Sequence, residues 1–492
     1  MNATWARLGD RAIEALVYAA IGFGVLALGG VWPIFLAVTF GLFAAAICLW
    51  AAVRLFCGVE ANAGDSGFLR EELAQPLKMR SPWIWIFILA IAVYLLLQMT
   101  PLPAGMVKIL SPRRAAQAEA FAQALPGLET QWLTLAMHPG RARQALAVVA
   151  LALMAFVCGA YLAARRPRAR RGILFLLGLS LVQALYGLVE FFSGHGYVLW
   201  FPGKPSDASG TFINRNHFAA FLSLFLPVSI GWFYYHAART RSRYERTNRL
   251  PSTSWDALSA REGLWLLAPA CLALAIVQSH SRGGFSSMLL GLALMFALGL
   301  RSPVARAFSA LGAVVALTLF IYGLYSDYDI VFSRFLRLTG ENELEGSRLG
   351  LWRESWGMFR DYPWFGVGLG AYAMAYNQYA QTSADLHPYM AHNEWLEGLL
   401  TLGIAGMALI VPAVAGFFVK SFRRLRYAGR DHPWLLGAWC GLVGLALHCV
   451  SEFNLHIPGI VAVAALLAGI LLGFDLPGRY SNGGAPPQDE HA

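Results

Sequence analysis

The chain has 492 residues, of which 57% are hydrophobic and only 13% are charged, with a formal net charge of +10. Soluble globular proteins carry roughly 25% charged residues, so a chain this apolar cannot cover itself with polar surface. The composition excludes a disordered chain, a disulfide-rich scaffold and a cytosolic enzyme. It predicts a polytopic membrane protein whose solvent is lipid.

Apolar stretches of about 18–22 residues are long enough to cross a bilayer as helices. The candidate spans are 12–31, 33–53, 82–99, 145–164, 172–193, 216–235, 263–279, 284–300, 304–325, 398–419, 434–450 and 458–475. The pattern therefore predicts an all-α fold, a polytopic membrane helix bundle with about twelve transmembrane helices.

Basic residues gather in three clusters, Arg165–Arg171, Arg239–Arg249 and Lys420–Arg430, which fall on one side of the membrane if the spans alternate. Short loops rich in Lys and Arg remain in the cytoplasm, so both termini are predicted to be cytoplasmic. The long segment 326–397 then lies on the outer side. The positive charge is a topology signal, and no nucleic-acid partner is expected.

The predicted sides divide the chain into segments of different character. These are N-terminal transmembrane helices (1–99), an outer loop (100–143), a transmembrane core (144–325), a large outer loop before the tenth span (326–397), C-terminal transmembrane helices (398–476) and a disordered cytoplasmic tail (477–492). Within the outer loops, helices are predicted at Pro112–Ala124 and Arg348–Arg360. Ordered function is expected on this outer face.

Several strongly polar side chains lie within a turn or two of the outer membrane edge. They are Arg215, His217, Arg282, His392, Glu394, Glu397, Glu452 and His456. Ionisable groups at this depth are costly and usually face a cavity. Two arginines from separate helix ends suit a diphosphate, because guanidinium groups bind phosphate oxygens bidentately, and a histidine beside them can act as a general base. Each residue alone is more often a membrane-edge anchor or a packed histidine, so only their convergence favours a site.

Other features of the outer face are interpreted as structural. Asp207 is expected to be a plain solvated residue of its loop. The glycines of Gly366–Gly370 have no strand–helix–strand context, so they predict a tight reversal and not a dinucleotide site. Gly283 and Gly284 are interpreted as a helix start or a close approach to a lipid headgroup, in preference to a helix-packing motif.

Five stretches, in this order along the chain, resemble the O-antigen ligase and O-antigen polymerase superfamily of bacterial polysaccharide assembly. They are Ser209–Ala219, Ser279–Gly284, Pro363–Gly370 with Arg348 and Trp352 before it, Ala391–Glu397 with the following Gly403–Gly406, and Ser451–Pro458. In the last stretch, the acidic position is often Asp in polymerase-like members and is Glu452 here. The resemblance covers residues 95–475.

The resemblance implies a metal-independent glycosyltransferase of the bacterial inner membrane that needs no cofactor. Such enzymes take a glycan from undecaprenyl diphosphate on the periplasmic side and pass it to an acceptor hydroxyl. Arg215 and Arg282 would bind the diphosphate, and His392 would be the general base, oriented by Glu394 or Glu397. The residues assigned to substrate binding are Asn214, Asn216, His217, Arg348, Asn393, Glu394 and Glu452.

The motif forms favour a polymerase that joins lipid-linked repeat units of an O-antigen or exopolysaccharide. The alternatives are a ligase that moves finished glycan to lipid A core, and transfer to a protein hydroxyl. A small-anion or bicarbonate transporter is disfavoured, because Glu190 is the only carboxylate clearly inside an expected span and away from the basic clusters at the span ends, and even Glu190 lies near the outer edge. The expected partners are the undecaprenyl-diphosphate-linked glycan donor, a glycan or lipid A core acceptor, the lipid bilayer and a chain-length regulator.

Overall fold

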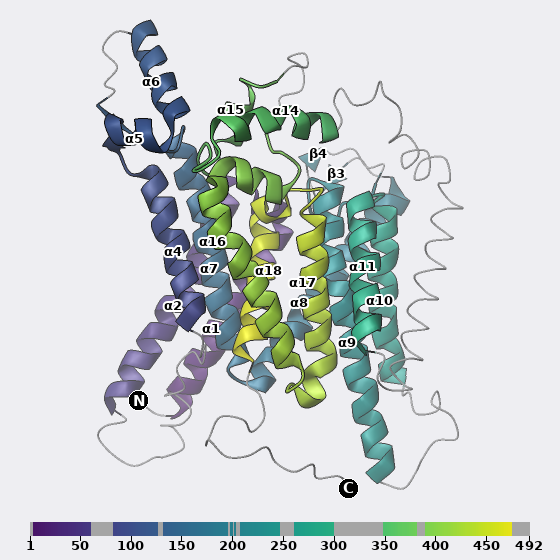
Figure 1. Ribbon diagram of the computed structural model, residues 1–492. Helices are drawn as coiled ribbons and strands as arrows, with labels where there is room; N and C mark the ends of the chain where they lie inside the picture. Colours follow the sequence, from purple (N-terminus) through teal and green to yellow (C-terminus); the bar gives the residue numbers. More distant parts are fainter. Residues whose placement is uncertain are drawn as a thin grey trace.

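The computed structural model describes residues 3–60, 82–125, 131–194, 197–199, 201–202, 207–246, 260–299, 348–380 and 389–474. Long helices run side by side as a bundle, and short helices cover the end that is uppermost in Figure 1. The bundle explains how so apolar a chain is accommodated, since many exposed large apolar side chains lie on the long helices, where lipid can cover them.

The long helices follow the apolar stretches. They are α1 (Ala3–Leu26), α2 (Pro33–Glu60), α4 (Pro82–Met99), α7 (Pro139–Ala163), α8 (Arg166–Ser193), α9 (Arg215–Arg246), α10 (Ala260–Gln278), α11 (Arg282–Gly299), α16 (Glu394–Leu425), α17 (His432–His448) and α18 (Pro458–Gly473). A helix thus overlaps every expected span except 304–325, which lies outside the described residues, as does the predicted tail 477–492.

Shorter elements lie at the ends of the long helices. They are α5 (Ala104–Leu110), α6 (Pro112–Ala124), α14 (Arg348–Asp361), α15 (Tyr372–Tyr376), and the 3₁₀ turns η1 (Leu28–Gly30), η5 (Gly429–Asp431) and η6 (Asn454–His456). Two antiparallel pairs of two-residue strands complete the fold: β1 (Leu102–Pro103) with β2 (Trp132–Leu133), and β3 (Tyr197–Val198) with β4 (Phe201–Pro202). The helices predicted at 112–124 and 348–360 are confirmed as α6 and α14.

Among the described residues, six helices are long and apolar enough to cross a membrane. They are α2, α7, α8, α9, α11 and α16, and shorter apolar helices occur within α4, α10 and α18. The prediction of a mostly helical, multi-pass membrane protein is therefore confirmed. The total of about twelve spans remains a prediction.

Small residues allow the central helices to pack backbone to backbone. A Cβ atom added to Gly159 of α7 would lie 2.1 Å from the carbonyl oxygen of Leu466 in α18. A Cβ atom added to Gly441 of α17 would lie 2.1 Å from the carbonyl oxygen of Leu224 in α9. Small residues at such contacts are typical of membrane helix pairs, where close backbone approach supplies the attraction. The α9–α17 contact determines which residues meet at the upper end of the bundle.

Helix α16 is interrupted at Gly403, whose φ of 64° and ψ of −173° are not helical. The backbone N–H groups of Val367 and Gly368 donate to the carbonyl oxygens of Leu400 and Thr401, at 3.0 and 2.9 Å. The preceding loop therefore satisfies carbonyl groups at the interruption. The expected span 398–419 lies within α16, and the structure adds the break at Gly403.

The loop that fills the interruption is the glycine-rich stretch Gly366–Gly370. Its three glycines have φ values of 66°, 97° and 73°, which are favourable only for glycine. A Cβ atom on Gly366 would lie 2.4 Å from the backbone of Thr401. The tight reversal predicted for this stretch is confirmed.

Candidate functional site

The predicted site residues meet where three helices begin. Arg215 is the first residue of α9, Arg282 of α11 and Glu394 of α16. The connection between α17 and α18 packs against these helix starts, and the Glu394 N–H donates to the Cys449 carbonyl at 2.8 Å. Helix N-termini carry partial positive charge, so this end of the bundle favours anions even before its arginines are counted.

Glu452 is the central carboxylate of this region, and its side chain is completely buried. His392 Nδ1 lies 3.2 Å from each of its two oxygens. Asn216, in the first turn of α9, donates to the same carboxylate through Nδ2 at 3.0 Å. One buried carboxylate therefore links the start of α9 to His392. The prediction that Glu394 or Glu397 orients the imidazole is wrong, because Glu452 occupies that position.

His392 is held in an unusual backbone conformation, with a φ of 49°. The N–H of the preceding Ala391 donates to Glu397 Oε2 at 2.8 Å, and the following Asn393 caps α16 by accepting from Leu396 N–H at 3.0 Å. A left-handed conformation in a non-glycine residue costs roughly 1–2 kcal/mol and persists only where its surroundings impose it. These two hydrogen bonds supply that constraint.

The imidazole of His392 has one nitrogen engaged and one available. Nδ1 faces the carboxylate of Glu452, which assigns the proton of the neutral ring to Nδ1. Nε2 has no hydrogen-bond partner within the described part of the chain, and about a third of the side chain (32%) is exposed. The ring can therefore accept a proton at Nε2 while Glu452 stabilises the resulting cation.

His217 lies nearby but in a different environment. Its side chain is buried, its Nδ1 is 3.0 Å from Asn454 Oδ1, and its ring meets the ring of Phe453 edge-on with centroids 4.7 Å apart. The same Phe453 ring meets His392 at 4.8 Å. His217 thus supports the loop that carries Glu452, a position that suits packing better than direct contact with substrate.

Asn214, predicted to bind substrate, also has a local structural contact. Its Oδ1 accepts the Asn216 N–H at 2.8 Å, at the start of α9. This is the geometry of an Asx turn that begins a helix. Asn214 and Asn393 therefore occupy equivalent places, each immediately before the helix that presents a charged site residue.

Asp207 is the residue that sequence reasoning missed. Its carboxylate pairs with the guanidinium of Arg215 and lies 2.6 Å from His280 Nδ1. Only 16% of its side chain is exposed, so the expectation of a plain solvated residue is wrong. Because His280 lies two residues before Arg282, Asp207 joins the two arginine-bearing segments. Its sequence position in a loop gave no periodic or motif signal for this role.

Arg282 is exposed at the start of α11, and the two glycines after it pack closely. A Cβ atom on Gly283 would lie 2.4 Å from His448 Nε2, and one on Gly284 would lie 2.3 Å from the Cβ of Ala219. The predicted helix start is confirmed. The prediction that these glycines do not serve helix packing is wrong, because both allow a neighbouring helix to approach closely. This packing brings the start of α11 against α9 and the end of α17.

His456 forms a second cluster beside the first, with Glu394 and Glu397. Its Nδ1 is 3.1 Å from Glu394 Oε2 and its Nε2 is 3.2 Å from Glu397 Oε1. Burial lowers the pKa of His456, but the two carboxylates outweigh burial and hold the pKa well above its usual range. The two carboxylates therefore favour the protonated form of His456. Its role is to neutralise the carboxylates that hold Ala391 and Leu455.

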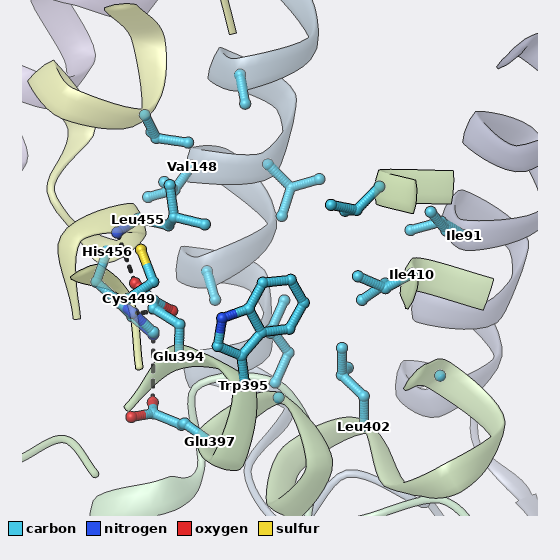
Figure 2. A pocket seen from close by; sticks show the side chains of 18 of the residues that line it. Ile91, Val148, Glu394, Trp395, Glu397, Leu402, Ile410, Cys449, Leu455 and His456 are labelled. Carbon is cyan, nitrogen blue, oxygen red and sulfur yellow. Dashed lines mark hydrogen bonds and ion pairs between the residues drawn. The ribbon is translucent and has the colours of Figure 1, made fainter. Parts of the chain in front are cut away.

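This cluster borders an apolar cavity of about 550 Å³. Figure 2 shows Glu394, Glu397 and His456 together at one side, with Ile91 and Ile410 across the cavity. The lining comes from α4, α7, α16, α17 and α18. Such a cavity suits a hydrocarbon chain whose polar end lies near the cluster.

Two further residues come from α14, which lies across the same end of the bundle (Figure 1). Trp352 donates through Nε1 to the carbonyl of Ala391 at 2.8 Å, so α14 supports the segment that carries His392. Arg348 begins α14, but its side chain lies outside the described residues.

The family comparison agrees with this arrangement. Residues 267–411 match the family model described as O-Antigen ligase. This match supports the resemblance to the O-antigen ligase and O-antigen polymerase superfamily that the sequence motifs indicate. No curated protein matches the chain. The matched residues include Arg282, His392 and the interrupted part of α16. The contacts described above join this stretch to Arg215 and Glu452, which lie outside the match. The family match and the apolar helices together support a membrane enzyme of glycan processing.

Proposed function

We propose that this protein is a glycosyltransferase that passes a glycan from a polyprenyl diphosphate to an acceptor hydroxyl. The observation that carries the proposal is the imidazole of His392, whose Nδ1 faces the carboxylate of buried Glu452 while about a third of the side chain (32%) remains exposed. A histidine oriented by a carboxylate is the arrangement that general base catalysis requires.

In the proposed reaction, Nε2 of His392 removes the proton of the acceptor hydroxyl as its oxygen attacks the anomeric carbon. The bond between that carbon and the diphosphate oxygen breaks, and its electron pair remains on the diphosphate. Arg215 and Arg282 would neutralise the developing charge, because fixed guanidinium groups stabilise charge where it forms. Glu452 would stabilise the imidazolium during transfer.

The contacts of Arg215 also support this division of roles. Asp207 pairs with its guanidinium and fixes its direction, while a third of the side chain (32%) stays exposed at the helix start. A preorganised arginine at a helix N-terminus is suited to a phosphate group. Asn216 and Glu394 are proposed to act through the contacts that they make with Glu452 and the α17–α18 connection.

The most specific form of the proposal is a polymerase that joins lipid-linked repeat units of an O-antigen or exopolysaccharide. The apolar cavity beside His456 supports a substrate with a long hydrocarbon chain. The donor would be an undecaprenyl-diphosphate-linked glycan, and a chain-length regulator is a candidate partner. We place the site in the periplasm and both termini in the cytoplasm, on the basis of the basic clusters at the other ends of the helices.

The test is to measure turnover and donor binding separately for His392→Ala. Positioned base catalysis contributes about 10²–10⁴-fold, so turnover should fall by that factor while donor binding is retained. His236→Ala, at the other end of α9, is the matched control and should keep wild-type turnover. Near-wild-type turnover of His392→Ala, or a loss explained by donor binding alone, would show that His392 is not the base.

The same assay separates polymerase from ligase. Purified protein is incubated with lipid-linked repeat units alone, and in parallel with lipid A core added. A ladder of products from repeat units alone is expected for a polymerase. Product that forms only when lipid A core is present would instead identify a ligase.

A further inference from the structure

A second polar pocket lies at the opposite end of the bundle from His392. It has a volume of about 480 Å³ and opens between the first turns of α8, the end of α9 and the connection from α16 to α17. The polar side chains in its lining are Arg170, Tyr234, Tyr235, Arg239, Arg430 and His432. None of these residues takes part in the proposed glycosyl transfer.

One arginine of this pocket is rigidly held. Arg170 donates through Nε and Nη2 to the two carboxylate oxygens of Asp431, both at 2.8 Å. Asp431 is buried and also accepts the Trp434 Nε1–H at 2.9 Å, so its carboxylate is fully engaged. The Arg170 guanidinium lies 5.2 Å from the centre of the Tyr235 ring. The Arg170–Asp431 pair therefore forms one rigid side of the pocket and carries almost no net charge.

The uncompensated charge of the pocket comes from two other arginines. Arg239 and Arg430 are both exposed, and within the described part of the chain neither has an ion-pair partner. They approach the pocket from different elements, the last turns of the α9 span and the turn η5. Among the described residues no carboxylate is part of this lining, and Arg170 neutralises Asp431, the neighbour of Arg430. The pocket thus carries an excess of about two positive charges.

The depth of the pocket indicates which anion it meets. The apolar part of α9 ends at Thr240, one residue after Arg239, and the span of α8 begins at Arg166, four residues before Arg170. These positions correspond to the headgroup region of a bilayer. Basic pockets between helices at this level bind anionic headgroups, and guanidinium groups match phosphate oxygens. The phenol of Tyr234 is a further donor to such a group.

We propose that this pocket binds a phosphate group, and that the phosphate is the headgroup of an anionic phospholipid. Arg239 and Arg430 would contact the phosphate oxygens, while the Arg170–Asp431 pair keeps the pocket in shape. The site would anchor the α16–α17 connection against α9. The proposal is independent of the glycosyl transfer proposed above.

The test measures lipid binding to the purified full chain in uncharged detergent. Native mass spectrometry and thermal unfolding would be followed on addition of dioleoyl-phosphatidylglycerol, dioleoyl-phosphatidylcholine or inorganic phosphate. The double variant Arg239→Gln/Arg430→Gln should weaken phosphatidylglycerol binding about 25-fold, since each basic residue near a lipid surface accounts for a factor of about five. Arg170 is not substituted, because its loss would leave the buried carboxylate of Asp431 without its ion-pair partner.

The matched control is Arg423→Gln/Arg426→Gln, which removes two exposed arginines of the same α16–α17 region that do not line the pocket. This control should bind phosphatidylglycerol as the wild type does. Stabilisation by inorganic phosphate to the same extent would support the phosphate site but overturn the lipid assignment. Equal affinity of the pocket variant and the wild type, or equal loss in the control, would overturn the site itself.

Discussion

The clearest test of the site geometry is Glu452→Gln. Glu452 is completely buried and contacts both His392 Nδ1, at 3.2 Å, and Asn216 Nδ2, at 3.0 Å. The substitution keeps the size and planarity of the side chain but removes its charge. The ground-state contacts can therefore persist, while the imidazolium that forms during proton transfer loses its counter-charge.

The size of the effect follows from that lost charge. A hydrogen bond to a charged group contributes about 1.5–3 kcal/mol, compared with about 1 kcal/mol for a neutral one. If this difference of about 0.5–2 kcal/mol applies mainly to the protonated imidazole, turnover should fall about two- to thirtyfold with little change in donor affinity. The loss should be smaller than that of His392→Ala, because the base itself remains.

The assay is turnover of purified protein on lipid-linked repeat units, with donor binding and thermal unfolding measured on the same preparations. Glu14→Gln is the matched control, because Glu14 is also a buried carboxylate paired with arginines but lies at the other end of the bundle. Its turnover should match the wild type. If Glu452→Gln keeps full turnover, or if its loss only mirrors lower stability, the assigned role of the carboxylate is wrong.

Three further outcomes are expected. Arg282→Lys keeps the charge but loses the planar guanidinium group, which can donate two parallel hydrogen bonds to phosphate oxygens. Turnover should therefore fall about ten- to hundred-fold in the repeat-unit assay. Because the folded protein raises the pKa of His456, the ion pairs of His456 stabilise the fold fully below the unfolded pKa of about 6.5, and this stabilisation is lost as pH rises through the folded pKa. The melting temperature of the wild type should therefore decline on alkaline titration. His456→Gln should lack this part of the decline. In a cysteine-free background, Tyr389→Cys, at a residue 79% exposed, should react with an impermeant thiol reagent when only the outer membrane is permeabilised.

For each of these three predictions, one result would contradict it. Wild-type turnover of Arg282→Lys at normal membrane abundance would make Arg282 an anchor without a role in phosphate binding. An identical pH profile for the wild type and His456→Gln would remove the assigned ion pairs. For topology, Arg426→Cys at the opposite end should label only after the inner membrane is opened. The reverse labelling of these two positions would invert the orientation and place the site in the cytoplasm.

The sequence alone determined the features that depend on local composition. Apolar stretches of membrane-crossing length located the helices, because a backbone in lipid must satisfy its hydrogen bonds within each segment. Helices were also predicted at the Ala/Gln-rich stretch 112–124 and at 348–360, where α6 and α14 lie. The ionisable residues at the outer edge were also identified individually, since charges beside apolar spans are conspicuous in any membrane sequence.

The tertiary structure decided which of these residues are partners. Glu394, Glu397 and Glu452 are equally acidic in sequence, but only Glu452 faces His392, sixty residues away, because the α17–α18 connection packs on the start of α16. Asp207 became part of the site for the same reason, since it meets Arg215 and His280 only after α9 and α11 pack together. Pairing between distant charges depends on helix packing, and that packing rests on glycine contacts whose partners lie on other helices.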